Sequence, residues 1–177
     1  DVTGALNYLL GELDVNNDGK YLSCDDDIGG VKKTIGIVGY SWGGYSVLAL
    51  MGHLGKDARF VDKPGKPEVN LGILDGVKTG RTAMRVNWDY QNDPFVRRNS
   101  TLWINVYQTN GATLPDSEVF GNRDWYKGES IPWATVNTQL TLIVTRRNLH
   151  YDHIELGYGF DGGEVYRRLV ADVLNKP

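Results

Sequence analysis

Apolar residues recur along this chain in two different patterns, and each pattern predicts one type of secondary structure. Short apolar runs rich in β-branched residues predict strands at residues 34–39, 70–74, 102–107 and 140–144. Apolar residues at helical spacing predict helices over residues 2–13, 43–54 and 163–174. Continuous apolar strands are typical of parallel sheets that are buried on both faces. Strands separated by long connections therefore predict an α/β domain.

The composition narrows the kinds of partner that this domain can have. Its 177 residues are 41% hydrophobic and 23% charged, close to globular averages. No apolar run approaches the roughly 18 residues of a membrane-spanning helix. The net charge of −3, without a basic block, argues against nucleic acid. Cys24 is the single cysteine, so no disulfide can form within the chain. We therefore expect a small-molecule partner, with no nucleic acid and no membrane span.

A serine stands at the turn between the first predicted strand and the helix that follows it. The turn, Gly39-Tyr40-Ser41-Trp42-Gly43, fits the pattern Gly-x-Ser-x-Gly, and a tight turn of this kind needs small residues on both sides. The hydroxyl then projects beyond the sheet, and the first NH groups of the helix point toward the same place. This context predicts Ser41 as a nucleophile and the NH of Trp42 as a donor to an oxyanion. The alternative is an incidental serine on a glycine-rich turn.

The segment Gly-Tyr-Ser-Trp-Gly-Gly-Tyr resembles the nucleophile elbow of the α/β-hydrolase superfamily, in particular of its lipases, esterases and serine peptidases. The resemblance covers nearly all of residues 1–177 and implies a partial domain. It would contain the C-terminal portion of the family's sheet, with the nucleophile strand, about three following parallel strands and flanking helices. The family's first half, which donates a second oxyanion NH, has no counterpart in the sequence. We therefore expect the chain alone to be inactive, and to need its missing N-terminal half or self-association.

The same resemblance implies a catalytic triad in the chain order Ser, then Asp or Glu, then His. Three histidines compete for the role of base. His53 falls about three turns along the helix after Ser41, too far from the hydroxyl. His150 and His153 follow the last predicted strand, where family members carry the catalytic histidine on a loop. We favour His153, because apolar residues directly after it can anchor the loop, and His150 is the alternative.

Several aspartates compete for the role of acid. Asp75 stands at the end of the second predicted strand, and catalytic groups of open α/β sheets gather at such ends. Some lipases of the family carry their acid after this strand. Most esterases and peptidases carry it one strand later, where the chain offers Asp116 and, farther on, Asp124. We favour Asp75, since it fits a strand end most closely; a turn or helix cap is the alternative role for it.

Residues 14–25 follow the twelve-position pattern of a calcium-binding loop. The candidate ligands are Asp14, Asn16, Asp18, Lys20 through its backbone carbonyl, and Asp25. The loop resembles those of EF-hands and dockerin repeats, although Asp in place of bidentate Glu at its last position is expected to weaken the affinity. We expect structural Ca²⁺ here, remote from the chemistry, and a solvated turn is the alternative. A calcium-type loop favours an extracellular or periplasmic protein.

These features predict a serine hydrolase that cleaves carboxylic esters, as lipases and esterases do, through a Ser-His-Asp triad and an acyl-enzyme, with no cofactor for catalysis. One alternative is a serine peptidase of the prolyl-oligopeptidase type, because Gly-Gly-Tyr after Ser41-Trp42 also resembles the elbow of that group. The other is a non-catalytic, calcium-binding structural domain.

Overall fold

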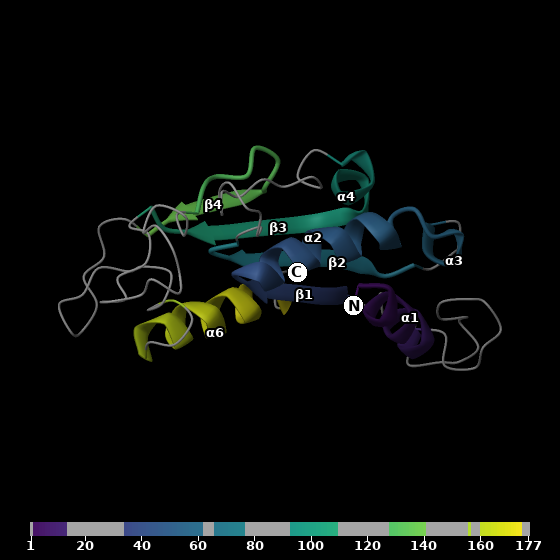
Figure 1. The fold of residues 1–177 in the computed structure, drawn as a ribbon, viewed down its shortest axis with the longest axis horizontal. Coiled ribbons are helices and arrows are strands. Elements are labelled where there is room, and N and C mark those ends of the chain that lie inside the picture. Colours follow the sequence, from purple (N-terminus) through teal and green to yellow (C-terminus); the bar gives the residue numbers. More distant parts are fainter. Residues whose placement is uncertain are drawn as a thin grey trace, which may run out of the picture.

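Four parallel strands form the sheet at the centre of the molecule. The structure, a computed structural model, describes residues 2–13, 34–61, 66–76, 93–109, 128–140, 156 and 160–174. The strands lie in the order β1 (Thr34–Tyr40), β2 (Glu68–Leu74), β3 (Ser100–Tyr107) and β4 (Val136–Gln139) (Figure 1). The described helices are α1 (Val2–Leu13), α2 (Trp42–Leu54), α3 (Ala58–Val61), α4 (Pro94–Asn99) and α6 (Phe160–Leu174). The prediction of an α/β domain with a parallel sheet and flanking helices is thus confirmed.

Strand β2 is buried on both faces because helices cover it from two sides. Val69, Leu71 and Ile73 belong to one core cluster, together with residues of α1 and α2. Leu74 belongs to a second cluster, which includes Leu169 and residues of β3. Since side chains alternate across a strand, α2 packs on one face of β2 and α6 on the other. This two-sided burial explains why β2 is mostly apolar on both faces.

Strand β1 is less buried than its apolar sequence predicts. Ile35 and Ile37 are only half-buried, whereas the sequence predicts a strand buried on both faces. Within the described residues β1 pairs with β2 alone, in parallel register from Thr34 opposite Glu68 to Tyr40 opposite Leu74. A strand with a neighbour on one side only receives less cover from side chains, and this accounts for the difference.

The last strand begins earlier than predicted. The sequence predicts a strand over residues 140–144, but β4 spans Val136–Gln139 and Leu140 follows it. The Leu140 NH still donates to the carbonyl of Tyr107 at 2.8 Å, which continues the ladder with β3 by one residue. Residues 141–144 lie outside the described part of the chain. All four residues of β4 are exposed, so they carry no apolar pattern from which a strand could be predicted.

Two short helices lie where the sequence shows only connections. Helix α3 is a single turn that buries Phe60 completely. Helix α4 begins after Asp93, whose carboxylate accepts a hydrogen bond from the NH of Phe95 at 2.8 Å, and Pro94 opens the helix. Both helices are too short to show helical periodicity. No helix of the described residues is long and apolar enough to cross a membrane.

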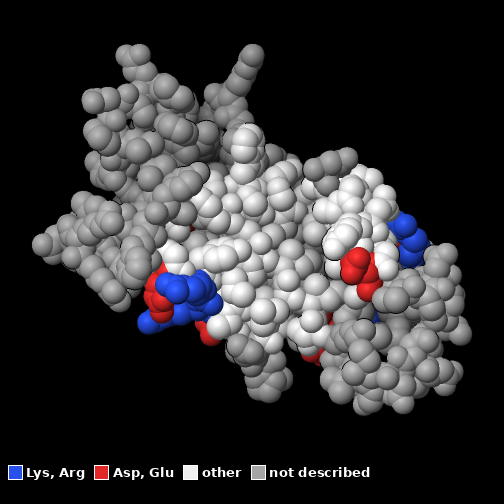
Figure 2. All heavy atoms as spheres, turned by 90° about the horizontal axis from the view of Figure 1, so that it is seen from below, with Lys and Arg blue, Asp and Glu red and all other residues white. Residues whose placement is uncertain are grey.

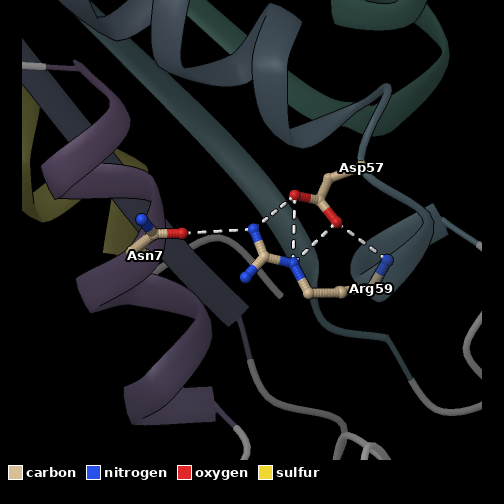
Figure 3. Close-up of polar contacts among 3 residues, drawn as sticks. All are labelled: Asn7, Asp57 and Arg59. Atoms are coloured by element: carbon tan, nitrogen blue, oxygen red, sulfur yellow. Dashed lines mark hydrogen bonds and ion pairs between the residues drawn. The ribbon is translucent and has the colours of Figure 1, made fainter.

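An ion pair connects the segment after α2 to α1. The guanidinium of Arg59 donates to Oδ2 of Asp57 at 2.7 Å and to Oδ1 of Asn7 on α1 at 3.2 Å (Figure 3). Asp57 also accepts from the backbone NH of Arg59 at 2.9 Å, so it caps α3. The side-chain hydrogen bonds from Arg59 hold the pKa of Asp57 below its ordinary value, although partial burial acts in the opposite direction. The pair thus ties α1 to α3.

Candidate active site

Three polar residues lie side by side where β1, β2 and β3 end. Ser41, Asp75 and Gln108 are each the first residue after their strand. The Ser41 NH donates to the carbonyl of Leu74 at 3.0 Å, and the Asp75 NH donates to the carbonyl of Val106 at 2.7 Å. These bonds extend the β1–β2 and β2–β3 pairings by one residue each, so Ser41, Asp75 and Gln108 lie next to one another across the ends of the three strands. The carboxyl edge of a parallel sheet is where open α/β domains bind ligands.

Ser41 has an unusual backbone conformation. Its φ of 55° and ψ of −121° lie in a region that residues with a side chain rarely adopt, so the turn between β1 and α2 is strained. Helix α2 begins at the next residue, and the Ser41 hydroxyl makes no capping hydrogen bond to it. The NH of Trp42 is the first NH of α2, which has no acceptor within the helix. Strand, strained turn and helix follow one another as the motif predicts.

Two glycines permit this turn, and one of them is not the residue that the motif predicts. A Cβ on Gly39 would collide with the backbone carbonyl of Gly43. A Cβ on Gly43 would meet no described atom within 4 Å, so the expected steric need for glycine does not apply there. The steric need for glycine falls instead on the next residue, Gly44, because a Cβ there would lie 2.9 Å from Cα of Gly76. The tight positions of the turn are thus 39 and 44.

Asp75 is a completely buried carboxylate with defined donors. Its side chain is 0% exposed, and its φ of 45° is the second positive φ among the non-glycine residues described. The side-chain amide of Gln108 donates to Oδ2 at 2.7 Å, and the backbone NH of Gln108 faces Oδ1 at 3.3 Å. A buried carboxylate needs such donors, because burying it without hydrogen bonds would destabilise the fold by roughly several kcal/mol. Asp75 is therefore oriented by β3, one strand away from Ser41.

Of the other predicted site residues, only His53 and Trp42 lie in the described part of the chain. His53 lies exposed in the last turn of α2, roughly 16 Å along the helix axis from its start. The side chain of Trp42 is 57% exposed at the first position of that helix. The predicted bases, the alternative acids and the calcium ligands lie outside the described residues: His150, His153, Asp116, Asp124, Asp14, Asn16, Asp18, Lys20 and Asp25. Their roles stay predictions.

The described residues themselves contain no group of three or more His, Cys, Asp or Glu side chains that could hold a metal ion. They do contain two residues of the site that the sequence pattern does not single out, Gln108 and Gly128. The position of Gln108 could have been noticed in the sequence, because Gln108 directly follows its strand, as Ser41 and Asp75 follow theirs. Gly128 reaches the site from a distant connection. Its NH donates to the carbonyl of Gln108 at 2.7 Å.

Comparisons of the chain with protein-family models, with curated proteins and with solved structures find no match.

Proposed function

We propose that this chain carries the nucleophile and the acid of a serine hydrolase of the α/β-hydrolase type, acting on carboxylic esters. The observation that supports it is the pairing of a serine on a strained turn with a buried, oriented carboxylate one strand away. In this proposal Ser41 is the nucleophile, Asp75 the acid and the NH of Trp42 an oxyanion donor. His153 is the base, with His150 as the alternative.

The proposed reaction has two halves with the same proton path. In the first half the imidazole takes the proton of Ser41 as Oγ bonds to the acyl carbon, and the carbonyl oxygen becomes an oxyanion beside the Trp42 NH. The ester bond then breaks, and the alcohol leaves with the proton from the imidazolium. In the second half the imidazole takes a proton from water as the water oxygen bonds to the acyl carbon. The bond between Oγ of Ser41 and the acyl carbon then breaks, the imidazolium gives its proton to Oγ, and the carboxylic acid leaves. Asp75 holds the imidazole in the required tautomer and stays ionised.

The ester specificity rests on the place of the acid. Asp75 follows the strand directly after the nucleophile strand, and in the resemblance stated above this is a lipase arrangement. The corresponding end of β3, where most esterases and peptidases of the family carry the acid, holds the neutral side chain of Gln108. Because lipases cleave esters, the lipase-like place of Asp75 favours an ester substrate over a peptide.

A fluorophosphonate probe tests the proposal, because it reacts with serines that are activated as nucleophiles. We expect the full-length protein to be labelled at Ser41, and Ser41→Ala to abolish both the labelling and the hydrolysis of p-nitrophenyl butyrate. Ser46→Ala is the matched control, since Ser46 lies on the next turn of α2 and its hydroxyl donates to the carbonyl of Trp42 at 3.1 Å. This variant should keep its activity.

Other outcomes separate the alternatives. Labelling of Ser41 with turnover of dipeptidyl amides and none of esters would support the peptidase. No labelling of correctly folded protein, together with binding of Ca²⁺, would support the non-catalytic structural domain.

A further inference from the structure

Gln108 and Gly128 form a clamp around the carboxylate of Asp75. The two donors of Gln108 address different oxygens of the carboxylate, at 2.7 and 3.3 Å, and Gln108 is itself completely buried. The NH of Gly128 donates to the backbone carbonyl of Gln108 at 2.7 Å. A Cβ on Gly128 would collide with Oδ1 of Asp75, so this position admits only glycine without a shift of the carboxylate.

The chemistry of this clamp suits an ionised acid. A carboxylate offers about four lone-pair sites, and Gln108 addresses one on each oxygen. Because the amide is neutral, it orients the anion and stabilises it without adding a charge. A carboxyl group at position 108 would instead share a proton with Asp75, since two buried carboxylates within hydrogen-bond distance do not both ionise readily.

We propose that Gln108 is a positioning residue, which holds Asp75 ionised and in a fixed orientation for its role as the acid of the triad. This inference rests on the proposed function, because it assigns Gln108 a role only through Asp75. This role also explains why an amide follows β3. In the proposed function the acid is Asp75, after β2, and the residue beside it must donate a hydrogen bond to its carboxylate.

A double-mutant cycle on the full-length protein tests this role, with p-nitrophenyl butyrate as the substrate. We expect Gln108→Leu to lower kcat/KM on the order of 100-fold, because a misplacement of about 1 Å in the triad has an effect of that size. In an Asp75→Asn background the same substitution should change kcat/KM by about 3-fold or less, since residues that act as a unit are not additive. Equal losses in both backgrounds would overturn the positioning role.

Gln108→Glu provides a second measurement if the leucine variant does not fold. The introduced carboxyl can still donate to Asp75 while it is protonated, so activity should persist at pH values where this carboxyl keeps its proton and the imidazole of the base is neutral. It should then fall as the introduced group ionises, which adds a step to the pH profile of kcat/KM that the wild type lacks. An unchanged profile would overturn the inference. Failure of the wild type to label at Ser41 would instead overturn the proposed function, and this role with it.

Discussion

At position 75, the substitution of asparagine for aspartate replaces one carboxylate oxygen by an NH₂ group and keeps the shape of the side chain. Asp75→Asn keeps the volume, but its amide has one acceptor oxygen where Gln108 presents two donors, at 2.7 and 3.3 Å. It also cannot hold the imidazole in the required tautomer. We expect kcat to fall about 10⁴-fold, as in triads whose acid becomes an amide. Asp116→Asn is the control and should lower kcat far less, with both melting temperatures measured. The reverse ranking would place the acid after β3.

The residues of this site differ in how much the sequence says about them. Ser41 stands inside a motif, and the motif lies between a predicted strand and a predicted helix. Asp75 follows an apolar run, so its place at a strand end can be predicted as well. Gln108 cannot be identified in this way, because an amide gains its role only through the carboxylate beside it. Gly128 meets Asp75 through a contact between distant parts of the chain, which no local pattern reports.

At the scale of the elements, the turn from β1 to α2 allows a matched test of steric need. Gly39→Ala places a methyl group against the backbone carbonyl of Gly43, which no side-chain rotation can relieve. We expect it to lower the free energy of unfolding by about 1–3 kcal/mol, as overpacking does. Gly43→Ala should instead raise this free energy by about 0.5–1 kcal/mol, because alanine suits a helix better than glycine. Urea denaturation measures both. Similar losses at the two positions would contradict this account of the turn.

The cap of α3 should make stability depend on pH. Asp57 has a lowered pKa because of its hydrogen bonds with Arg59, so its charge stabilises the fold above its ordinary pKa of about 3.9. This contribution is lost as the pH falls through the lowered value. We expect Asp57→Ala to cost about 1 kcal/mol at pH 7, as for other caps. Asp57→Asn keeps a capping oxygen and should cost less, with a deficit that vanishes at acidic pH. A deficit independent of pH would argue against the charge effect.

The elements that the sequence predicts well are those with helices on both sides or with an apolar stripe of sufficient length. β2 and β3 are mostly apolar because residues of the two core clusters lie on both of their faces. β4 has exposed side chains only, so its parallel pairing with β3 leaves no trace in the hydrophobic pattern. α4 is marked by Asp93-Pro94 alone, a local signal in which Asp93 caps and Pro94 opens a helix of just six residues. Prediction thus fails where burial is slight or the element is short.

At the scale of the whole molecule, the described surface on the side of β1 carries few charged side chains. Helices α1 and α6 and strand β1 lie lowest in Figure 1, and Figure 2 views the molecule from that side. Most of the described surface in this view belongs to residues other than Lys, Arg, Asp and Glu, and the charged atoms form a few separate groups. Leu174, at the end of α6, is 54% exposed and lies over Gly36 of β1. A strand such as β1, at the edge of the described part of the sheet and with few charged atoms on the described surface beside it, favours pairing with another chain.

We therefore expect the isolated chain of residues 1–177 to self-associate through the β1 side of its sheet. Leu174→Lys places a charge beside β1, at a helix C-terminus that accommodates a cation well, so the fold should tolerate it. The variant should raise the monomer fraction in light scattering coupled to size-exclusion chromatography. Val136→Lys is the matched control, since Val136 is an exposed apolar residue, 37% exposed, on β4 at the other side of the described sheet. Because β4 is short and its other residues are polar, the control should leave association unchanged. A monomeric wild-type chain, or equal effects of the two variants, would show that the β1 side does not mediate association.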